Sequence, residues 1–229
     1  VSGRDITANL RFVEGVHLCF DHHASEAERI ANRANRIIDP TAPSAARVVY
    51  NHFGGKKGFP AIADDLIEAV DQADSANYTE EDVLAPDKWT MLNFIVDPRT
   101  GIGRFQDFSA TNEQFMLALM TYCRHSPIDE LLRLPEVEER VHRYLEHEER
   151  AEHQIVRCAT VHGGLVVLDM RRETMIYATN RFTVYGLYPH CSLSLHVLKD
   201  ETPGRVRFGL GHSILNRTSK VDAGAVMLE

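Results

Sequence analysis

The stretch Val16–Ser25, with the sequence VHLCFDHHAS, decides the fold of the first part of the chain. Its apolar beginning is typical of a buried strand, and it ends abruptly in a carboxylate and two imidazoles: Asp21, His22 and His23. In a parallel sheet, ligands and metals gather at the carboxyl ends of the strands. Neutral imidazole and carboxylate suit borderline divalent metals such as Mn²⁺, Fe²⁺ or Zn²⁺. We therefore expect an α/β fold with a parallel sheet and a candidate site at the end of this strand.

Two adjacent histidines can divide the work, because one can bind a metal while the other faces the substrate. The alternative is an exposed loop with two ordinary histidines. A His-His pair without further context favours this alternative. The predicted strand before the pair and the helix start after it favour a site.

Several segments, in order along the chain, carry a resemblance to a known family. Asp21–His23 resembles the third motif of the DHH phosphoesterases, and Ala42–Tyr50 resembles the small-residue helix that follows it. Val70–Ser75 resembles their fourth, aspartate motif, while Val206–Ser213 and Val221–Gly224 resemble the approach to the glycine-rich loop of the associated DHHA1 domain. The superfamily includes manganese pyrophosphatases, exopolyphosphatases, single-strand exonucleases, oligoribonucleases and cyclic-dinucleotide phosphodiesterases. The resemblance is closest to the proteins labelled exopolyphosphatase-related.

The resemblance implies a role for each polar residue of the first site. His22 is the implied metal ligand, and His23 is the implied catalytic residue that faces the substrate phosphate. Asp21 would fix the neighbouring imidazole through a hydrogen bond. Asp74 matches the fourth-motif metal ligand best, with Asp71, one helical turn earlier, as the second choice. A pair of aspartates near the end of a surface helix is the alternative interpretation of these two residues.

Hydrolysis of a phosphoester or phosphoanhydride near neutral pH requires an activated nucleophile and neutralisation of the phosphoryl charge. Two divalent metals can supply both, because they share a water and stabilise the attacking and leaving oxygens. The resemblance implies Mn²⁺ as the cofactor, with Mg²⁺ or Co²⁺ as alternatives. In the second half of the chain it implies substrate-binding residues after the last predicted strand: His212, Ser213, Asn216 and Arg217. Arginine suits this role because its guanidinium can form two parallel hydrogen bonds to a phosphate.

The pattern of the chain changes near Ile155, and this change predicts two domains. We expect a parallel-sheet, DHH-like α/β domain over residues 1–130 and a connecting helix over residues 131–154. Alternating apolar residues around tight-turn signals then predict a small DHHA1-like α+β domain over residues 155–229. The connecting helix is highly charged, which is typical of a solvated face. Its three histidines lack a metal-binding spacing, and we expect them at the surface: His142, His147 and His153.

Both ends of the chain depart from the family pattern. The first motif, with closely spaced aspartates, and the second, a lone aspartate after a strand, have no match before Val16, where Arg4–Val13 predicts a short helix instead. The family's Gly-Gly-Gly-His run is not reached before Glu229. We therefore expect both domains to be incomplete here, and this chain alone to show at most weak hydrolase activity.

Composition bounds the choice of partners and compartment. A net charge of −8 argues against a broad nucleic-acid surface, which needs clustered Lys and Arg, but it permits a small anionic phosphorylated substrate. No apolar run is long enough to span a membrane. The cysteines lack paired spacing, so we expect reduced thiols in a cytoplasmic protein: Cys19, Cys123, Cys158 and Cys191. The oligomeric state is left open, with a homodimer as one option.

The sequence thus predicts a metal-dependent, exopolyphosphatase-related hydrolase that acts on a phosphoester or phosphoanhydride bond of a small phosphorylated or nucleotide substrate. Two alternatives stay open. One is a catalytically inactive binding or regulatory module with the same fold, and the other is a single-strand exonuclease or oligoribonuclease. Polyphosphate, pyrophosphate, an oligonucleotide and a cyclic dinucleotide are all candidate substrates.

Overall fold

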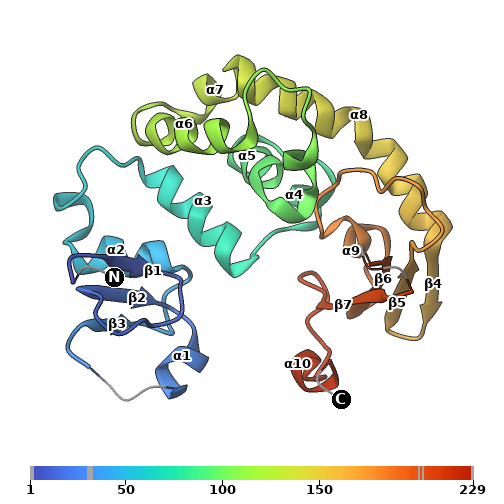
Figure 1. The fold of residues 1–229 in the computed structure, drawn as a ribbon, viewed down its shortest axis with the longest axis horizontal. Helices are drawn as coiled ribbons and strands as arrows, with labels where there is room; N and C mark the ends of the chain where they lie inside the picture. The colour runs from blue at the N-terminus through green and yellow to red at the C-terminus, as the bar shows by residue number, and fades with distance from the viewer. Residues whose placement is uncertain (1–2, 30–32, 201, 203, 228–229) are drawn as a thin grey trace. The chain divides into compact units, whose positions relative to one another are not determined.

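The structure is a computed structural model that describes residues 3–29, 33–200, 202 and 204–227. By their contacts the residues form two compact units, which we call the first and the second unit. The first unit comprises Val1–Asn77 with Thr121–Pro127, and the second comprises Tyr78–Met120 with Ile128–Glu229. This division differs from the expected boundary near residue 130, because the helices after Tyr78 pack in the same unit as the second sheet. Each unit has its own sheet (Figure 1).

The sheet of the first unit is parallel, as the sequence predicted. Its strands are β1 (Ile6–Ala8), β2 (Leu18–Asp21) and β3 (Arg36–Ile38), in that order across the sheet. The predicted helix over Arg4–Val13 is wrong, because β1 occupies its first half. Ile6 and its neighbour are β-branched, and three residues of β1 gain ladder hydrogen bonds by pairing with β2.

Among the described residues of the first unit, one helix lies between β2 and β3 in the sequence and two follow β3 (Figure 1, blue to cyan). They are α1 (Ala24–Arg29), α2 (Ala45–His52) and α3 (Asp64–Ser75). A short 3₁₀ turn, Gly55–Lys57, lies between α2 and α3. The buried core combines β2 with the start of α2, and its members are Phe20, Ala42 and Val48, packed against Leu18, Ile37 and Val49. This packing holds the end of β2 close to the beginning of α2.

The second unit begins with helical structure. Its elements up to the second sheet are α4 (Glu80–Leu84), α5 (Lys88–Val96), the 3₁₀ turns Pro98–Thr100 and Ile102–Arg104, α6 (Asn112–His125), α7 (Ile128–Leu131) and α8 (Pro135–Cys158). The last residues of α6 belong to the first unit. Helix α8 packs on α5, α9 and β5, which places it inside the second unit.

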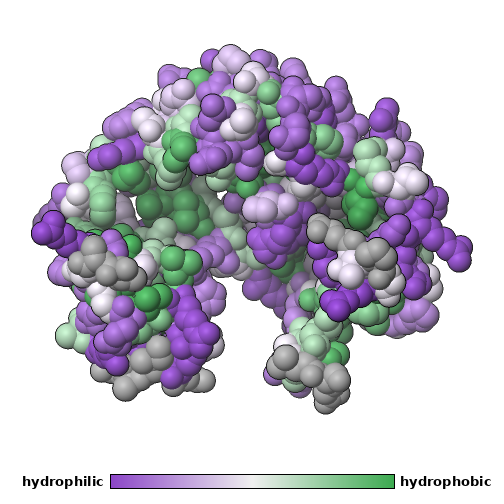
Figure 2. Space-filling model, viewed as in Figure 1, coloured by the Kyte–Doolittle hydropathy of each residue, from purple (hydrophilic) through white to green (hydrophobic). Residues whose placement is uncertain are grey.

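One side of α8 is charged and solvated, as predicted, with exposed Glu138, Glu146, Glu149 and Arg150. In Figure 2 the surface over α8, at the upper right, is largely hydrophilic. The expectation that all three α8 histidines lie at the surface is right for His142 and His153 but wrong for His147, which is 8 % exposed. The physical reason is the helical period, because His147 belongs to the buried stripe with Arg140, Tyr144, Ala151, Gln154 and Ile155.

The second sheet contains β4 (Ala159–His162), β5 (Leu165–Asp169), β6 (Leu193–Lys199) and β7 (Val206–His212), in that order. β4 pairs with β5 and β6 pairs with β7 in antiparallel hairpins, as predicted, whereas β5 and β6 are parallel. Helix α9 (Thr183–Leu187) lies in the connection between β5 and β6, and α10 (Ala223–Val226) follows β7. The fold class is therefore α/β, with a parallel sheet in the first unit and a mixed α+β arrangement in the second. Within the described part of the chain, no helix has the length and apolarity needed to cross a membrane.

Candidate functional site

Asp21, the last residue of β2, organises the turn that carries the two histidines. Its side chain is only 4 % exposed, and Oδ1 accepts hydrogen bonds from the backbone amides of His22 (2.7 Å) and His23 (2.9 Å). The ring nitrogen Nδ1 of His23 lies 2.7 Å from the same oxygen. Burial alone would raise the pKa of Asp21, but the hydrogen bonds from His23 and His22 outweigh it and hold the pKa below the usual 3.8. Asp21 is therefore an ionised acceptor that fixes both neighbours.

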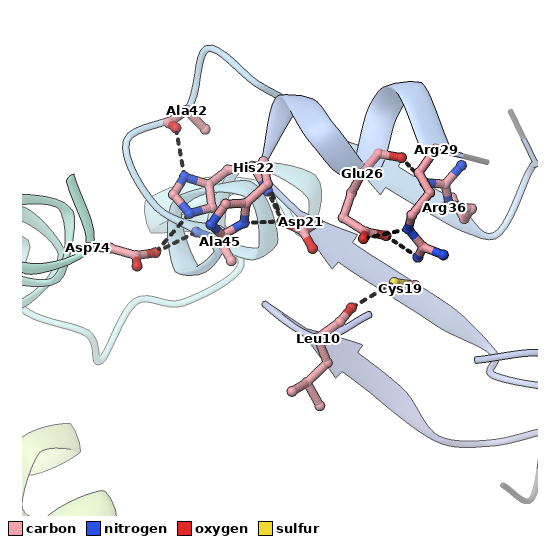
Figure 3. A network of polar contacts seen from close by, with 11 residues as sticks. Leu10, Cys19, Asp21, His22, Glu26, Arg29, Arg36, Ala42, Ala45 and Asp74 are labelled. Carbon is pink, nitrogen blue, oxygen red and sulfur yellow. Dashed lines mark hydrogen bonds and ion pairs between the residues drawn. The ribbon is translucent and has the colours of Figure 1, made fainter. Parts of the chain in front are cut away.

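His22 contacts two segments that lie far from it in the sequence (Figure 3). Its Nδ1 lies 3.2 Å from the carbonyl oxygen of Ala42, and its Nε2 lies 3.1 Å from Oδ2 of Asp74. A carbonyl oxygen can only accept, so Nδ1 must carry a proton. In the neutral ring, Nε2 then presents a lone pair to a carboxylate oxygen.

The contact between His22 and Asp74 is at ion-pair distance but does not have hydrogen-bond geometry. Nε2 of His22 is buried and has no hydrogen-bond partner among the described residues. Two lone pairs at 3.1 Å repel each other unless a cation or a proton lies between them. Two ligands of one ion, each about 2.0–2.2 Å from it, are themselves about 3 Å apart at a right angle. A histidine ligand also usually donates its other ring N–H to a carbonyl or carboxylate, as His22 does here. The pair therefore fits a divalent metal.

Asp74 lies in the last turn of α3. Its side chain is 28 % exposed, and Oδ2 also accepts a hydrogen bond from the amide of Ala45 at 3.3 Å. Ala45 is the first residue of α2. The two residues that the resemblance implies as metal ligands thus lie within 3.1 Å of each other, and their role as ligands stays a prediction.

Asp71 is held by a different set of partners. Its Oδ1 accepts from the hydroxyl of Ser44 at 2.6 Å, and its Oδ2 accepts from Nε of Arg47 at 2.7 Å, with a second bond from the same guanidinium. Both carboxylate oxygens are thus engaged. The geometry favours Asp74 over Asp71 as the aspartate beside His22.

His23 is the exposed member of the histidine pair. Its side chain is 54 % exposed, and its ring meets that of His22 edge to face, with centroids 4.5 Å apart. Because the Asp21 carboxylate accepts from Nδ1, the other ring nitrogen is left to accept or donate a proton. An oriented imidazole of this kind can serve as a general acid or base, or donate to a phosphoryl oxygen.

Within the described residues, no group of three or more His, Cys, Asp or Glu side chains is arranged to hold a metal ion. His22 and Asp74 therefore account for two ligands. A metal there would take its other ligands from water, substrate oxygens or further protein groups.

The four substrate-binding residues expected in the second half of the chain lie together in the second unit, at and after the end of β7. His212 is exposed, and Ser213 is buried with its Oγ accepting from the amides of Leu215 (3.2 Å) and Asn216 (2.9 Å). Nδ2 of Asn216 donates to the carbonyl of His190 at 3.0 Å. Arg217 donates from Nε to a nearby carbonyl at 3.0 Å. Ser213 and Asn216 thus hold the loop that presents the other two.

Ser44 and Arg47 both contact Asp71, and the sequence did not single them out. Ser44 follows a proline-rich break and caps α2 by accepting from the amide of Arg47, so its cap position was readable from the sequence. Arg47 gave no such signal, because an arginine in the first turn of a helix is usually solvated.

No protein-family model matches the sequence, and a search of curated proteins finds no significant relative. Among solved structures, the chain is similar to a pGpG-specific phosphodiesterase, PggH from Vibrio cholerae. The TM-score is 0.85 and the sequence identity is 45 %, over 98 % of this chain and 73 % of that chain. The chain belongs to the family of this phosphodiesterase. The predicted enzyme class, a hydrolase that acts on phosphoester bonds, is thereby confirmed.

Membership in this phosphodiesterase family agrees with the resemblance to the DHH phosphoesterases. It also agrees with the predicted small phosphorylated substrate, because a dinucleotide is small and anionic. The relation to exopolyphosphatases and the manganese cofactor stay predictions.

Proposed function

We propose that this protein is a DHH-type, metal-dependent phosphodiesterase that hydrolyses a short linear dinucleotide, with pGpG as the first candidate. Similarity to PggH over nearly the whole chain supports the reaction class and the candidate substrate. The observation that carries the metal dependence is the buried Nε2 of His22, which faces the Asp74 carboxylate without a hydrogen-bond partner among the described residues.

His22 and Asp74 would hold a divalent ion, most simply Mn²⁺. When bound, such an ion neutralises phosphoryl charge and lowers the pKa of its water, so that hydroxide forms near neutral pH. His22 prepares for this role by donating Nδ1–H to Ala42, which leaves Nε2 as a lone-pair donor. Mg²⁺ and Co²⁺ are alternatives, because carboxylate oxygen also suits harder cations.

The Asp21–His23 pair supplies the chain's own acid-base function. Asp21 is buried and ionised, and it orients the His23 ring through Nδ1. The remaining ring nitrogen of His23 donates to a phosphoryl oxygen when protonated, or takes a proton when neutral. The charge on Asp21 stabilises the protonated ring during this exchange.

The substrate contacts at the end of β7 belong to the same proposal. His212 and Arg217 carry the groups that suit a phosphate or a base edge, and Ser213 and Asn216 hold their loop. A dinucleotide presents a terminal phosphate and a scissile diester, and both are anionic groups that a histidine or an arginine can bind. The net charge of −8 favours such a small substrate over a long nucleic acid.

The test uses the full-length natural protein with Mn²⁺ and a panel of substrates. The panel contains pGpG, the adenine analogue pApA, a cyclic guanine dinucleotide, pyrophosphate, long-chain polyphosphate and a 20-nucleotide RNA. We expect hydrolysis of pGpG to two GMP molecules, a lower kcat/KM for pApA, and loss of activity when a chelator removes the metal.

The control is His22→Ala, which should abolish the Mn²⁺-dependent reaction. Faster release of phosphate from polyphosphate or pyrophosphate would replace the proposed substrate with the exopolyphosphatase-related one. Processive degradation of the RNA would favour the exonuclease, and no turnover of any substrate would favour a binding module.

A further inference from the structure

A polar clamp joins α2 to α3 directly behind the proposed metal ligands. Its members are Ser44, Arg47 and Asp71, and we call them the α2–α3 clamp. Ser44 donates to one oxygen of Asp71, and the Arg47 guanidinium donates twice to the other. The same Ser44 hydroxyl accepts from the amide of Arg47, which closes a ring of hydrogen bonds. The clamp thus ties the first turn of α2 to the last two turns of α3.

The clamp is largely shielded from solvent. The side chains of Arg47 and Asp71 are 25 % and 14 % exposed, and Ser44 is fully buried. An arginine that donates two hydrogen bonds to a carboxylate in such a shielded place has more directional strength than an exposed ion pair. It can therefore hold two helices in a fixed register.

Asp71 and Asp74 are three residues apart on α3, so their side chains lie on the same side of the helix. Both carboxylates face the start of α2, where Ala45 donates to Asp74 and Ser44 donates to Asp71. Arg47 binds only one of them. It neutralises Asp71, and this leaves the carboxylate of Asp74 beside Nε2 of His22.

We propose that Arg47 and Asp71 are positioning residues that select Asp74 as the metal ligand and hold it against His22. The inference rests on the proposed function, because it concerns the same metal. In this proposal Asp71 positions Asp74 and does not itself bind the metal. Partners of this kind, one contact removed from the ion, typically alter metal affinity or activity by 10–100-fold.

The test is Mn²⁺ binding measured by titration calorimetry on the full-length protein, together with urea unfolding of each variant. Arg47→Ala and Asp71→Ala should each weaken Mn²⁺ binding about tenfold or more. Arg47→Lys should fall between Arg47→Ala and the wild type, because lysine keeps the charge but not the two-pronged geometry.

The double variant Arg47→Ala/Asp71→Ala separates positioning from a purely structural role. Removing both partners leaves no unpaired charge, so stability should recover relative to the single variants. Mn²⁺ affinity should stay about tenfold reduced, because nothing then orients α3. Recovery of the Mn²⁺ affinity along with the stability would overturn the inference.

Arg171→Ala is the matched control, because Arg171 also donates two hydrogen bonds to an aspartate carboxylate, that of Asp169 in the second unit. It should leave Mn²⁺ binding unchanged. Two further results would overturn the inference. If Asp71→Ala abolished Mn²⁺ binding and Arg47→Ala did not, Asp71 would be a metal ligand. If Arg47→Ala raised the KM for pGpG and left the Mn²⁺ affinity unchanged, Arg47 would be a substrate contact. If the wild-type protein bound no Mn²⁺, the proposed metal dependence would fail as well. If the wild type bound Mn²⁺ and all clamp variants bound it equally well, only the positioning role of the clamp would fail.

Discussion

Two imidazoles, one in each unit, differ in what surrounds their ring nitrogens. His22 is 12 % exposed as a side chain, and its Nε2 faces a carboxylate without a hydrogen-bond partner among the described residues. His147 is buried, and its Nδ1 accepts a hydrogen bond from the amide of Ala178 at 3.0 Å. The rings of Phe105 and Tyr177 meet it edge to face, with centroids 5.3 and 5.4 Å away.

The surrounding charges have opposite signs at the two histidines. Burial lowers the pKa of His147, and three arginines lower it further: Arg104, Arg143 and Arg150. A cation would be repelled there, and the lone pair of Nδ1 is already used. At His22 the neighbouring charge is the Asp74 carboxylate, and the lone pair of Nε2 is unused. Burial alone therefore does not make a histidine a candidate metal ligand, whereas an unused lone pair beside a carboxylate does.

The largest expected effect separates the two histidines by activity. His22→Ala should lower kcat/KM for pGpG by about a thousandfold or more, because loss of a metal ligand removes several kcal/mol of transition-state stabilisation. His147→Gln should stay within about threefold of the wild type, since glutamine can still accept from Ala178. The measurement is steady-state hydrolysis with saturating Mn²⁺, and equal losses in both variants would remove the distinction.

The effect of Mn²⁺ on thermal stability compares the same two histidines in a second way. A ligand at a hundred times its Kd stabilises a folded protein by about 2.7 kcal/mol. Mn²⁺ should therefore raise the melting temperature of the wild type and of His147→Gln by several degrees, and a chelator should reverse the shift. His22→Ala should show no shift. Scanning calorimetry with and without Mn²⁺ tests this, and an undiminished shift in His22→Ala would place the metal elsewhere.

Much of the first site could be predicted from the sequence because its signals are local. An apolar run that ends in Asp21 and two histidines predicts both the strand and the polar site at its carboxyl end. The preference for Asp74 over Asp71 rested on the resemblance alone, because both lie on one side of a single helix and no local pattern separates them. Arg47, from another helix, decides it through a tertiary contact.

Two errors have equally physical causes. β1 has only three residues and is defined by its pairing with β2, which no local pattern records. His147 was placed at the surface because charged neighbours dominate its segment. Its spacing from Tyr144 and Ala151, which continues a buried stripe, was the signal that could have corrected this.

A third prediction concerns the carboxylate behind His23. Asp21→Asn should lower kcat by about tenfold to a hundredfold while Mn²⁺ affinity changes little, because the amide still accepts from His23 but carries no charge. Asp74→Asn is the contrasting variant, and it should weaken Mn²⁺ binding instead. Parallel measurement of kcat and of the Mn²⁺ Kd tests the division, which fails if Asp21→Asn loses the metal.

The same hydrogen bonds give Asp21 a defined effect on stability. They lower its pKa below 3.8, so their stabilisation is fully present above that pH and is lost as the pH falls through the lowered pKa. At pH 7 Asp21→Asn should therefore unfold at a lower urea concentration than the wild type. Between pH 4 and pH 2 the difference should shrink.

The smallest expected effect is the pH dependence contributed by His147. Its pKa is below 6.5 in the folded protein, so the unfolded chain binds more protons as the pH falls. The free energy of unfolding should therefore decrease from pH 6.5 downwards, through the lowered pKa, by at most about 1.4 kcal/mol per pH unit for this one group. The charges that face the ring are those of Arg104, Arg143 and Arg150, opposed by Glu146.

His147→Gln should flatten this dependence, because glutamine keeps an acceptor for the Ala178 amide and does not titrate. His153→Gln on the exposed side of the same helix is the matched control, and its dependence should follow the wild type. Urea unfolding at pH 7.5 and pH 5.5 gives the comparison for all three proteins. If His147→Gln retained the full decrease in the free energy of unfolding, another titrating group would cause it. The contrast between His147 and His22 would then rest on metal coordination alone.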